Sequence, residues 1–263
     1  DLGSSGLRMF GSQFAFFLNK NTDNVLIARF LGATSLGAYA IAYNLILFPV
    51  TRIAGPIRSV LFPAMSRIQD QRDRLISGWL TGNRLVAAIA VLAMLGMVVV
   101  APDFVPVVLG DQWTSAVPVM QILAVVGLVQ ALELTCGSAL TAIGAFSAVL
   151  RFTVTSYILN VAAFAAGLHW GIVGVATAYA VATVALFPFF VWLTASRLGC
   201  TVGTYARSLW GIAQSALLMM VALVCIRVAL VSAGVSAAVR LGVVIAVGAG
   251  AYLALIKLRS PDL

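Results

Sequence analysis

The sequence has 263 residues, of which 62% are hydrophobic and only 9% charged, and its mean hydropathy is +1.07. These values lie far outside the range of a water-soluble domain of this length, so we expect an integral membrane protein. The net charge of +8 would suit a nucleic-acid binder. However, the basic residues fall mostly between apolar runs and do not interleave with aromatic residues, which argues against nucleic acid as a partner.

Eight apolar runs are long enough, at roughly 20 residues each, to cross about 30 Å of bilayer core. They do not alternate between apolar and polar residues as the strands of a membrane barrel do. Because a helix satisfies its backbone hydrogen bonds internally, the sequence predicts an all-α integral membrane protein with about eight transmembrane helices. The runs cover residues 9–31, 36–62, 79–101, 115–142, 147–167, 171–194, 207–230 and 237–257.

The connections between these runs differ in charge. Those on one side of the predicted bundle are basic, whereas those on the other side are poor in Lys and Arg except for Arg240 at the last helix. The positive-inside rule therefore predicts that both ends of this chain are cytoplasmic. The basic residues on the predicted cytoplasmic side are Arg67, Arg72, Arg74, Arg151, Arg197, Arg207, Lys257 and Arg259.

Residues that could carry catalysis are scarce. His169 is the only histidine, and its place in a predicted turn beside Trp170 fits an interfacial position. The three cysteines, Cys136, Cys200 and Cys225, form no CxxC pair. We therefore expect no catalytic residue, no metal site and no cofactor, and we do not expect the chain to be an enzyme.

The first predicted helix carries polar residues near its middle, in the stretch FFLNKNTDNVLIARF. Ionisable side chains inside a membrane cost about 2.5–3.5 kcal/mol each on insertion scales, so they face a partner or a cavity that holds water. Lys20 and Asp23 are three residues apart, and one interpretation is that they only neutralise each other. The other is that they line a substrate path together with Asn19 and Asn24, which Glu133 of a later helix could join.

The stretch FPVTRIAGPIRSVLFPAMSRIQD carries Pro49, Pro56 and Pro63 at intervals of seven residues. At about 100° per residue the three prolines lie on one side of a helix, and each lacks a hydrogen-bond donor. Membrane bundles tolerate the freed carbonyls beside other helices or cavity water, so the stretch predicts a bent helix that borders an aqueous space. We expect Arg52 in the substrate path, while Arg58 fits either that path or ordinary cytoplasmic charge.

Three segments carry a family resemblance: NTDNVLIARFLGATSLGAYAIAYNLILFP, SVLFPAMSRIQD and FVPVVLGDQWTSAVPVMQILAVVGL. They resemble the C-terminal half of the polysaccharide exporters within the multidrug, oligosaccharidyl-lipid and polysaccharide flippase superfamily. The similarity is greatest to lipopolysaccharide exporters of the colanic-acid type. It covers most of residues 8–200, whereas the last two helices are generic.

The resemblance implies a six-helix transporter lobe over residues 1–198, two additional transmembrane helices over residues 199–263, and an N-terminal lobe that is missing from this chain. It also implies a bacterial inner-membrane protein that moves a polyprenyl-pyrophosphate-linked oligosaccharide by alternating access. The expected partners are this lipid-linked oligosaccharide, a coupling ion (H⁺ or Na⁺), membrane lipids and the missing lobe.

Two other functions stay open. A multidrug or toxin exporter of the same superfamily would have an acidic, aromatic-lined site for organic cations, whereas this half of the protein is basic overall. A membrane-embedded enzyme of glycan assembly, such as a polymerase or ligase, would need a large extracytoplasmic loop, and the predicted connections on that side are short.

Overall fold

The computed structural model describes the backbone of residues 2–259 and the side chains of residues 22–52, 56–57, 59–252 and 254. The described chain is helical and contains no strand. Its α-helices are α1 (Leu2–Pro49), α2 (Gly55–Arg67), α3 (Arg72–Phe104), α4 (Ala116–Ala142), α5 (Phe146–Gly167), α6 (Gly171–Leu198), α7 (Val202–Ser232) and α8 (Ala237–Arg259). Short π and 3₁₀ turns join some of them: η1 (Val50–Ala54), η2 (Val105–Leu109), η3 (Asp111–Trp113) and η4 (Leu168–Trp170).

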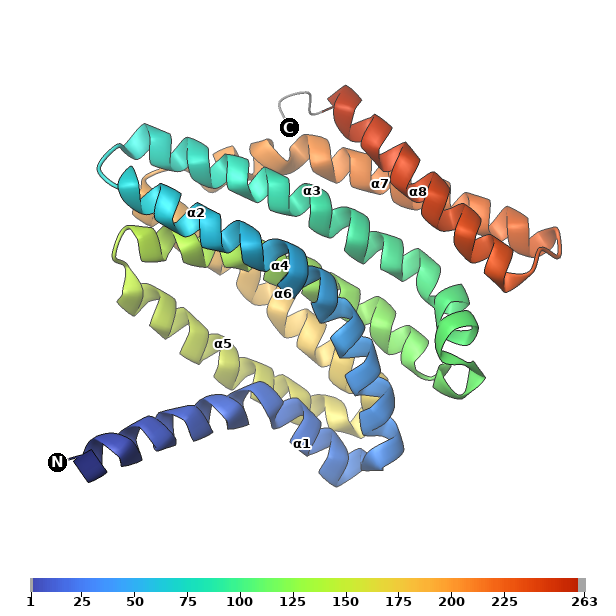
Figure 1. Ribbon diagram of the computed structural model, residues 1–263, viewed down its shortest axis with the longest axis horizontal. Helices are drawn as coiled ribbons and strands as arrows, with labels where there is room; N and C mark the ends of the chain where they lie inside the picture. Colours follow the sequence, from blue (N-terminus) through green and yellow to red (C-terminus); the bar gives the residue numbers. More distant parts are fainter. Residues whose placement is uncertain (1, 260–263) are drawn as a thin grey trace.

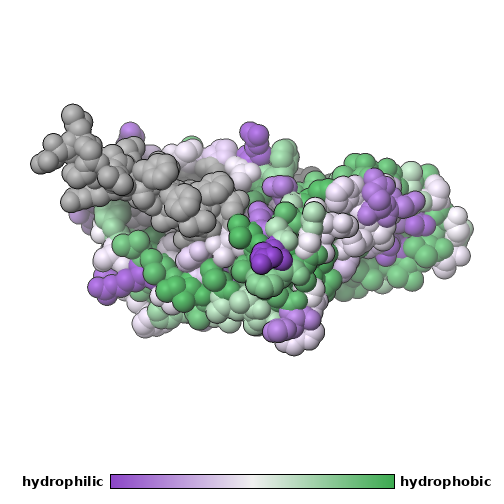
Figure 2. All heavy atoms as spheres, turned by 90° about the horizontal axis from the view of Figure 1, so that it is seen from below, coloured by the Kyte–Doolittle hydropathy of each residue, from purple (hydrophilic) through white to green (hydrophobic). Residues whose placement is uncertain are grey.

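Within the described residues, five stretches are long and apolar enough to cross a membrane, and Ala237–Tyr252 is a shorter apolar helix. One of the five, Phe146–Leu198, holds both α5 and α6, which pack against each other on either side of η4. Hydrophobic residues also cover much of the face shown in Figure 2, with hydrophilic residues in small groups. The chain is an all-α, multi-pass membrane protein, as its composition predicts.

The first two predicted helices form one element, α1, with a kink at Gly32. Gly32 has φ 85° and ψ 171°, a conformation that is open to glycine but strained for residues with a Cβ atom. The kink falls between the predicted spans 9–31 and 36–62, so the boundary between them is confirmed as a change of helix direction within α1.

Helix α4 is central to the bundle and packs against α1, α2, α3 and α6 (Figure 1). Small residues allow these helices to approach closely. A Cβ atom at Gly127 would lie 2.7 Å from Cγ2 of Ile46 on α1 and 2.8 Å from Sδ of Met94 on α3. Gly127 therefore sits where three helices meet. Helices α7 and α8 pair with each other and pack against α3, on the side of the bundle away from α5 (Figure 1).

The proline-rich stretch is interrupted by the π-helical turn η1, which begins directly after Pro49. Proline removes backbone donors, and a π turn is one way for a helix to absorb the lost hydrogen bonds. The predicted disturbance of this helix is confirmed. Pro56 and Pro63 are exposed, whereas Pro49 is half-buried, because the π turn changes the angular register that the spacing of seven assumes.

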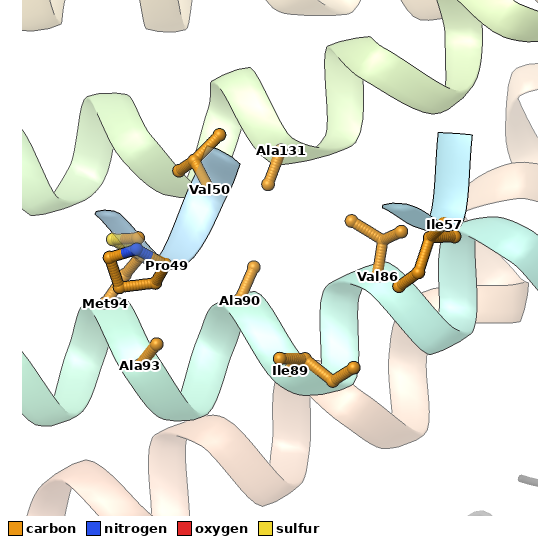
Figure 3. Close-up of a pocket in the computed structure, with 9 residues that line it drawn as sticks. All are labelled: Pro49, Val50, Ile57, Val86, Ile89, Ala90, Ala93, Met94 and Ala131. Atoms are coloured by element: carbon orange, nitrogen blue, oxygen red, sulfur yellow. The ribbon is translucent and has the colours of Figure 1, made fainter. Parts of the chain in front are cut away.

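Pro49 and Val50 line a small apolar pocket against α3 and α4, shown in Figure 3. We expected the proline side of this helix to border an aqueous space. That expectation is wrong at Pro49, because the side chains of α3 and α4 that face it there are apolar. The other lining residues are Ile57, Val86, Ile89, Ala90, Ala93, Met94 and Ala131.

Candidate functional site

A cavity of about 300 Å³ lies among α1, α4, α5 and α6. Two carboxylates and several hydroxyl and amide groups line it, although all four helices are otherwise mostly apolar. Polar groups are costly inside a membrane bundle and mark functional positions there, so this cavity is the candidate site. It is lined by Asp23 and Tyr43 of α1, Gln130 and Glu133 of α4, Phe152, Thr153, Ser156, Tyr157, Asn160 and Phe164 of α5, and Tyr179, Thr183 and Leu186 of α6.

The structure brings Asp23 and Glu133 together in this cavity from helices far apart in the sequence. Asp23 is 7% exposed, and its Oδ1 accepts a hydrogen bond from the backbone N–H of Asn24 at 2.8 Å. Glu133 is half-buried and lies well inside α4. Both salt bridges found among the described side chains involve Asp103, so neither cavity carboxylate has a described cation as its partner.

Two hydrogen bonds tie the walls of the cavity together. Nε2 of Gln130 on α4 donates to the hydroxyl oxygen of Tyr179 on α6 at 2.8 Å. The hydroxyl groups of Thr22 on α1 and Tyr157 on α5 lie 2.9 Å apart and share one hydrogen bond. These contacts orient two of the aromatic rings of the walls, those of Tyr157 and Tyr179.

Three other polar atoms of the cavity lining are buried and have no hydrogen-bond partner among the described residues: Oγ of Ser156, Oδ1 of Asn160 and Oγ1 of Thr183. Thr183 is only 5% exposed. Buried polar atoms in proteins are nearly always paired, so these three leave hydrogen-bonding capacity within the site.

Regular helical spacing places these side chains on the cavity. On α5, Thr153, Ser156, Tyr157 and Asn160 follow the i, i+3, i+4, i+7 pattern that puts residues on one helix face. These residues were not predicted as site residues from the sequence. The polar stripe that they form inside an apolar run was the signal that could have found them.

Of the remaining predicted site residues, Asn24 is half-buried and does not line the cavity, and the others lie elsewhere or cannot be placed. Arg52 does not line the cavity; it is exposed, and its guanidinium carbon lies 5.9 Å from the centre of the Phe48 ring. The side chains of Asn19, Lys20 and Arg58 lie outside the described residues. The pairing of Lys20 with Asp23 and the role of both arginines therefore stay predictions.

Sequence comparison identifies relatives of this chain. A family model described as "Polysaccharide biosynthesis protein" matches residues 1–118. Lipopolysaccharide biosynthesis protein WzxC of Escherichia coli (strain K12) is 34% identical over 74% of this chain and 40% of its own length. Teichuronic acid biosynthesis protein TuaB of Bacillus subtilis (strain 168) is 30% identical over 100% of this chain and 54% of its own length.

Structural comparison agrees on the fold. The solved structure of lipid II flippase MurJ in an inward closed conformation superimposes with a TM-score of 0.77 and 14% sequence identity, covering 97% of this chain and 54% of that one. The chain thus spans about half the length of the proteins it matches. Residues 1–118 thus match the polysaccharide biosynthesis protein family, the sequence similarity to WzxC and TuaB extends beyond them, and the MurJ structure shows a shared fold.

Proposed function

We propose that the full-length protein moves a lipid-linked oligosaccharide across the bacterial inner membrane by alternating access, and that this chain forms one wall of the transport path. The observation that carries the proposal is the polar cavity among α1, α4, α5 and α6, which offers hydrogen-bonding groups at membrane depth. The relatives support it, since they include a succinoglycan biosynthesis transport protein of Rhizobium meliloti and a probable low-salt glycan biosynthesis flippase of Haloferax volcanii.

The proposal assigns residues 1–198 to a six-helix lobe and α7 and α8 to an additional pair. A second lobe, N-terminal to this chain, would close the other side of the path, because one lobe cannot enclose an alternating-access cavity. Both ends of this chain would be cytoplasmic, as the basic connections predict. Translocation makes and breaks no covalent bond, so the proposed activity needs no catalytic residue or cofactor.

The proposal also gives the two cavity carboxylates a role. Asp23 and Glu133 would bind the coupling ion, H⁺ or Na⁺, because a carboxylate with no cationic partner among the described side chains attracts a small cation. Movement of the ion would then favour one of the two orientations of the transport path.

A second candidate function is export of organic cations. The lining of the cavity favours it, since two carboxylates and five aromatic rings surround the space and no Lys or Arg does so among the described residues. The basic character of this half as a whole therefore does not extend to the described lining of this cavity. The polysaccharide-related names of the relatives favour the first candidate.

The test is complementation of a strain that lacks the full-length gene. We expect the wild-type protein to restore surface polysaccharide. The variant Glu133→Gln keeps the shape of the side chain but removes its charge, and we expect it to leave lipid-linked oligosaccharide accumulated inside the cell. Asp111→Asn, in the exposed turn η3, is the matched control and should behave as wild type. Unchanged surface polysaccharide in the deletion strain, together with sensitivity to ethidium, would favour the cation exporter instead.

A further inference from the structure

Three polar atoms of the cavity have no partner among the described residues, and they indicate what kind of ligand fits it. Ser156 and Thr183 each present a hydroxyl group, which donates and accepts, and Asn160 presents an amide oxygen, which accepts. The three side chains come from the facing helices α5 and α6. A ligand that satisfies all three must itself carry several groups that both donate and accept hydrogen bonds.

The charged groups that the structure describes around the cavity disfavour an anionic ligand. Asp23 and Glu133 are the charged groups among its described lining residues, and both are acids. Phosphate groups are bound by Arg, Lys or clusters of backbone N–H groups, and two carboxylates would repel a pyrophosphate. Arg52, which the sequence places in the substrate path, is exposed and does not line this space.

Aromatic rings complete the lining. Tyr43, Tyr157 and Tyr179 each combine a flat apolar ring with a hydroxyl group, and Phe152 and Phe164 are apolar. The volume of about 300 Å³ lies at the lower end of the range of small-molecule sites, roughly 300–1,000 Å³. Such a space suits a compact ring system with apolar faces and polar edges.

From these features we propose that the cavity is a glycan subsite: it binds uncharged sugar residues of the transported molecule through Ser156, Asn160 and Thr183 and excludes the pyrophosphate. The inference rests on the proposed function and deepens it. The pyrophosphate is then held outside this cavity, and the two ends of one substrate are recognised by separate groups.

The test measures the affinity of the purified full-length protein for two probes. One probe is an uncharged oligosaccharide cut from the surface polysaccharide of the same cells, and the other is undecaprenyl pyrophosphate without sugar. The variants are Thr183→Val and Ser156→Ala. Each removes one hydroxyl group that has no partner in the structure, so neither should lower thermal stability. Thr177→Val is the matched control on α6, because the Thr177 hydroxyl is exposed and donates to the carbonyl of Val173 in its own helix.

We expect each variant to raise the dissociation constant of the oligosaccharide about fivefold to tenfold, as loss of one well-made hydrogen bond does, and to leave that of undecaprenyl pyrophosphate unchanged. Equal weakening of both probes, or unchanged oligosaccharide affinity in both variants, would overturn the inference. A shift of Na⁺ or H⁺ dependence without a change in oligosaccharide affinity would also overturn it, in favour of a purely ionic site.

A different result is expected if the proposed transport function is wrong. In that case the wild-type protein binds neither probe, and the proposed glycan subsite is rejected together with the transport function. When wild type binds both probes and the variants weaken both equally, the proposed transport stands and the subsite alone is rejected. A marked loss of thermal stability in both variants would show that their hydroxyl groups are paired within the protein, which contradicts the premise of the inference.

Discussion

Arg240 at the start of α8 donates two hydrogen bonds to Oδ1 of Asp103 in the last turn of α3, from Nε at 3.0 Å and from Nη2 at 2.6 Å. Oδ2 of the same carboxylate accepts a hydrogen bond from Nε of Arg227 on α7 at 2.7 Å. Asp103 is 2% exposed. One buried carboxylate therefore connects α3 with both helices of the C-terminal pair, and it explains Arg240, the basic residue that departs from the charge pattern of the connections.

We predict that Asp103→Asn destabilises the contact of α7 and α8 with α3. Removing the carboxylate charge leaves Arg227 and Arg240 without a counter-ion. Because both arginines are partly exposed, we expect the free energy of unfolding to fall by about 1–3 kcal/mol, which is below the range for fully buried pairs. Thermal unfolding of the purified full-length protein in detergent measures it. Asp111→Asn is the control, and equal melting temperatures for the two variants would show that the ion pairs contribute nothing.

A second prediction concerns two glycines of α4. Gly127→Ala should destabilise the bundle by about 1–3 kcal/mol, because the new methyl group would overlap Ile46 and Met94. Gly137→Ala should be neutral or stabilising by up to about 1 kcal/mol, since alanine favours helix and no side chain lies within 4 Å of the new Cβ atom. The same unfolding assay compares them. Equal effects of the two substitutions would contradict the close approach of α1, α3 and α4.

The third prediction contrasts two asparagines. Oδ1 of Asn83 accepts hydrogen bonds from the hydroxyl groups of Thr135 at 2.6 Å and Tyr205 at 3.3 Å, and Asn83 is 0% exposed. Asn83→Ala should therefore lower the free energy of unfolding by about 1–3 kcal/mol, because it leaves the buried Tyr205 hydroxyl without its described acceptor, whereas Thr135 can still donate to the carbonyl of Leu132. Asn160→Ala should cost less, since Oδ1 of Asn160 has no described partner. A greater loss of stability for Asn160→Ala than for Asn83→Ala would be inconsistent with this assignment.

Arg52 gives a fourth prediction. Its described contact is with the exposed ring of Phe48, a cation–π pair that contributes only about 0.5–1 kcal/mol at the surface. We predict that Arg52→Ala reduces polysaccharide export with little change in melting temperature, whereas Arg52→Lys, which keeps the charge, retains part of the export. Surface polysaccharide in the complemented deletion strain is the measurement. Normal export by Arg52→Ala would remove this residue from the substrate path.

Much of the fold could be predicted from the sequence, because apolar runs of membrane length determine where helices form. The kink at Gly32 also fell at a predicted boundary. The π turn after Pro49 was not predicted, since helical periodicity assumes a constant rotation per residue. For the same reason, the predictions that the three prolines share one side of the helix and that this side borders an aqueous space are wrong at Pro49.

The candidate site was predicted only in part. Asp23 and Glu133 stood out because charges are rare in apolar helices, and the structure places both in one cavity. Gln130, Asn160 and Thr183 did not stand out, because uncharged polar residues are less unusual and their convergence depends on how α4, α5 and α6 cross. The ion pairs of Asp103 could not be predicted, because Asp103 lies just beyond the predicted span 79–101 and its partners on α7 and α8 are more than a hundred residues away.

The most direct test of the central claim is translocation of a fluorescent lipid-linked oligosaccharide by the full-length protein in proteoliposomes. We predict that the labelled lipid crosses the bilayer much faster in vesicles with the wild-type protein than in protein-free vesicles. Glu133→Gln should slow this step about tenfold or more, which corresponds to about 1.4 kcal/mol in the barrier. Movement no faster than in protein-free vesicles, or an equal rate for wild type and Glu133→Gln, would contradict the assignment of the polar cavity to the transport path.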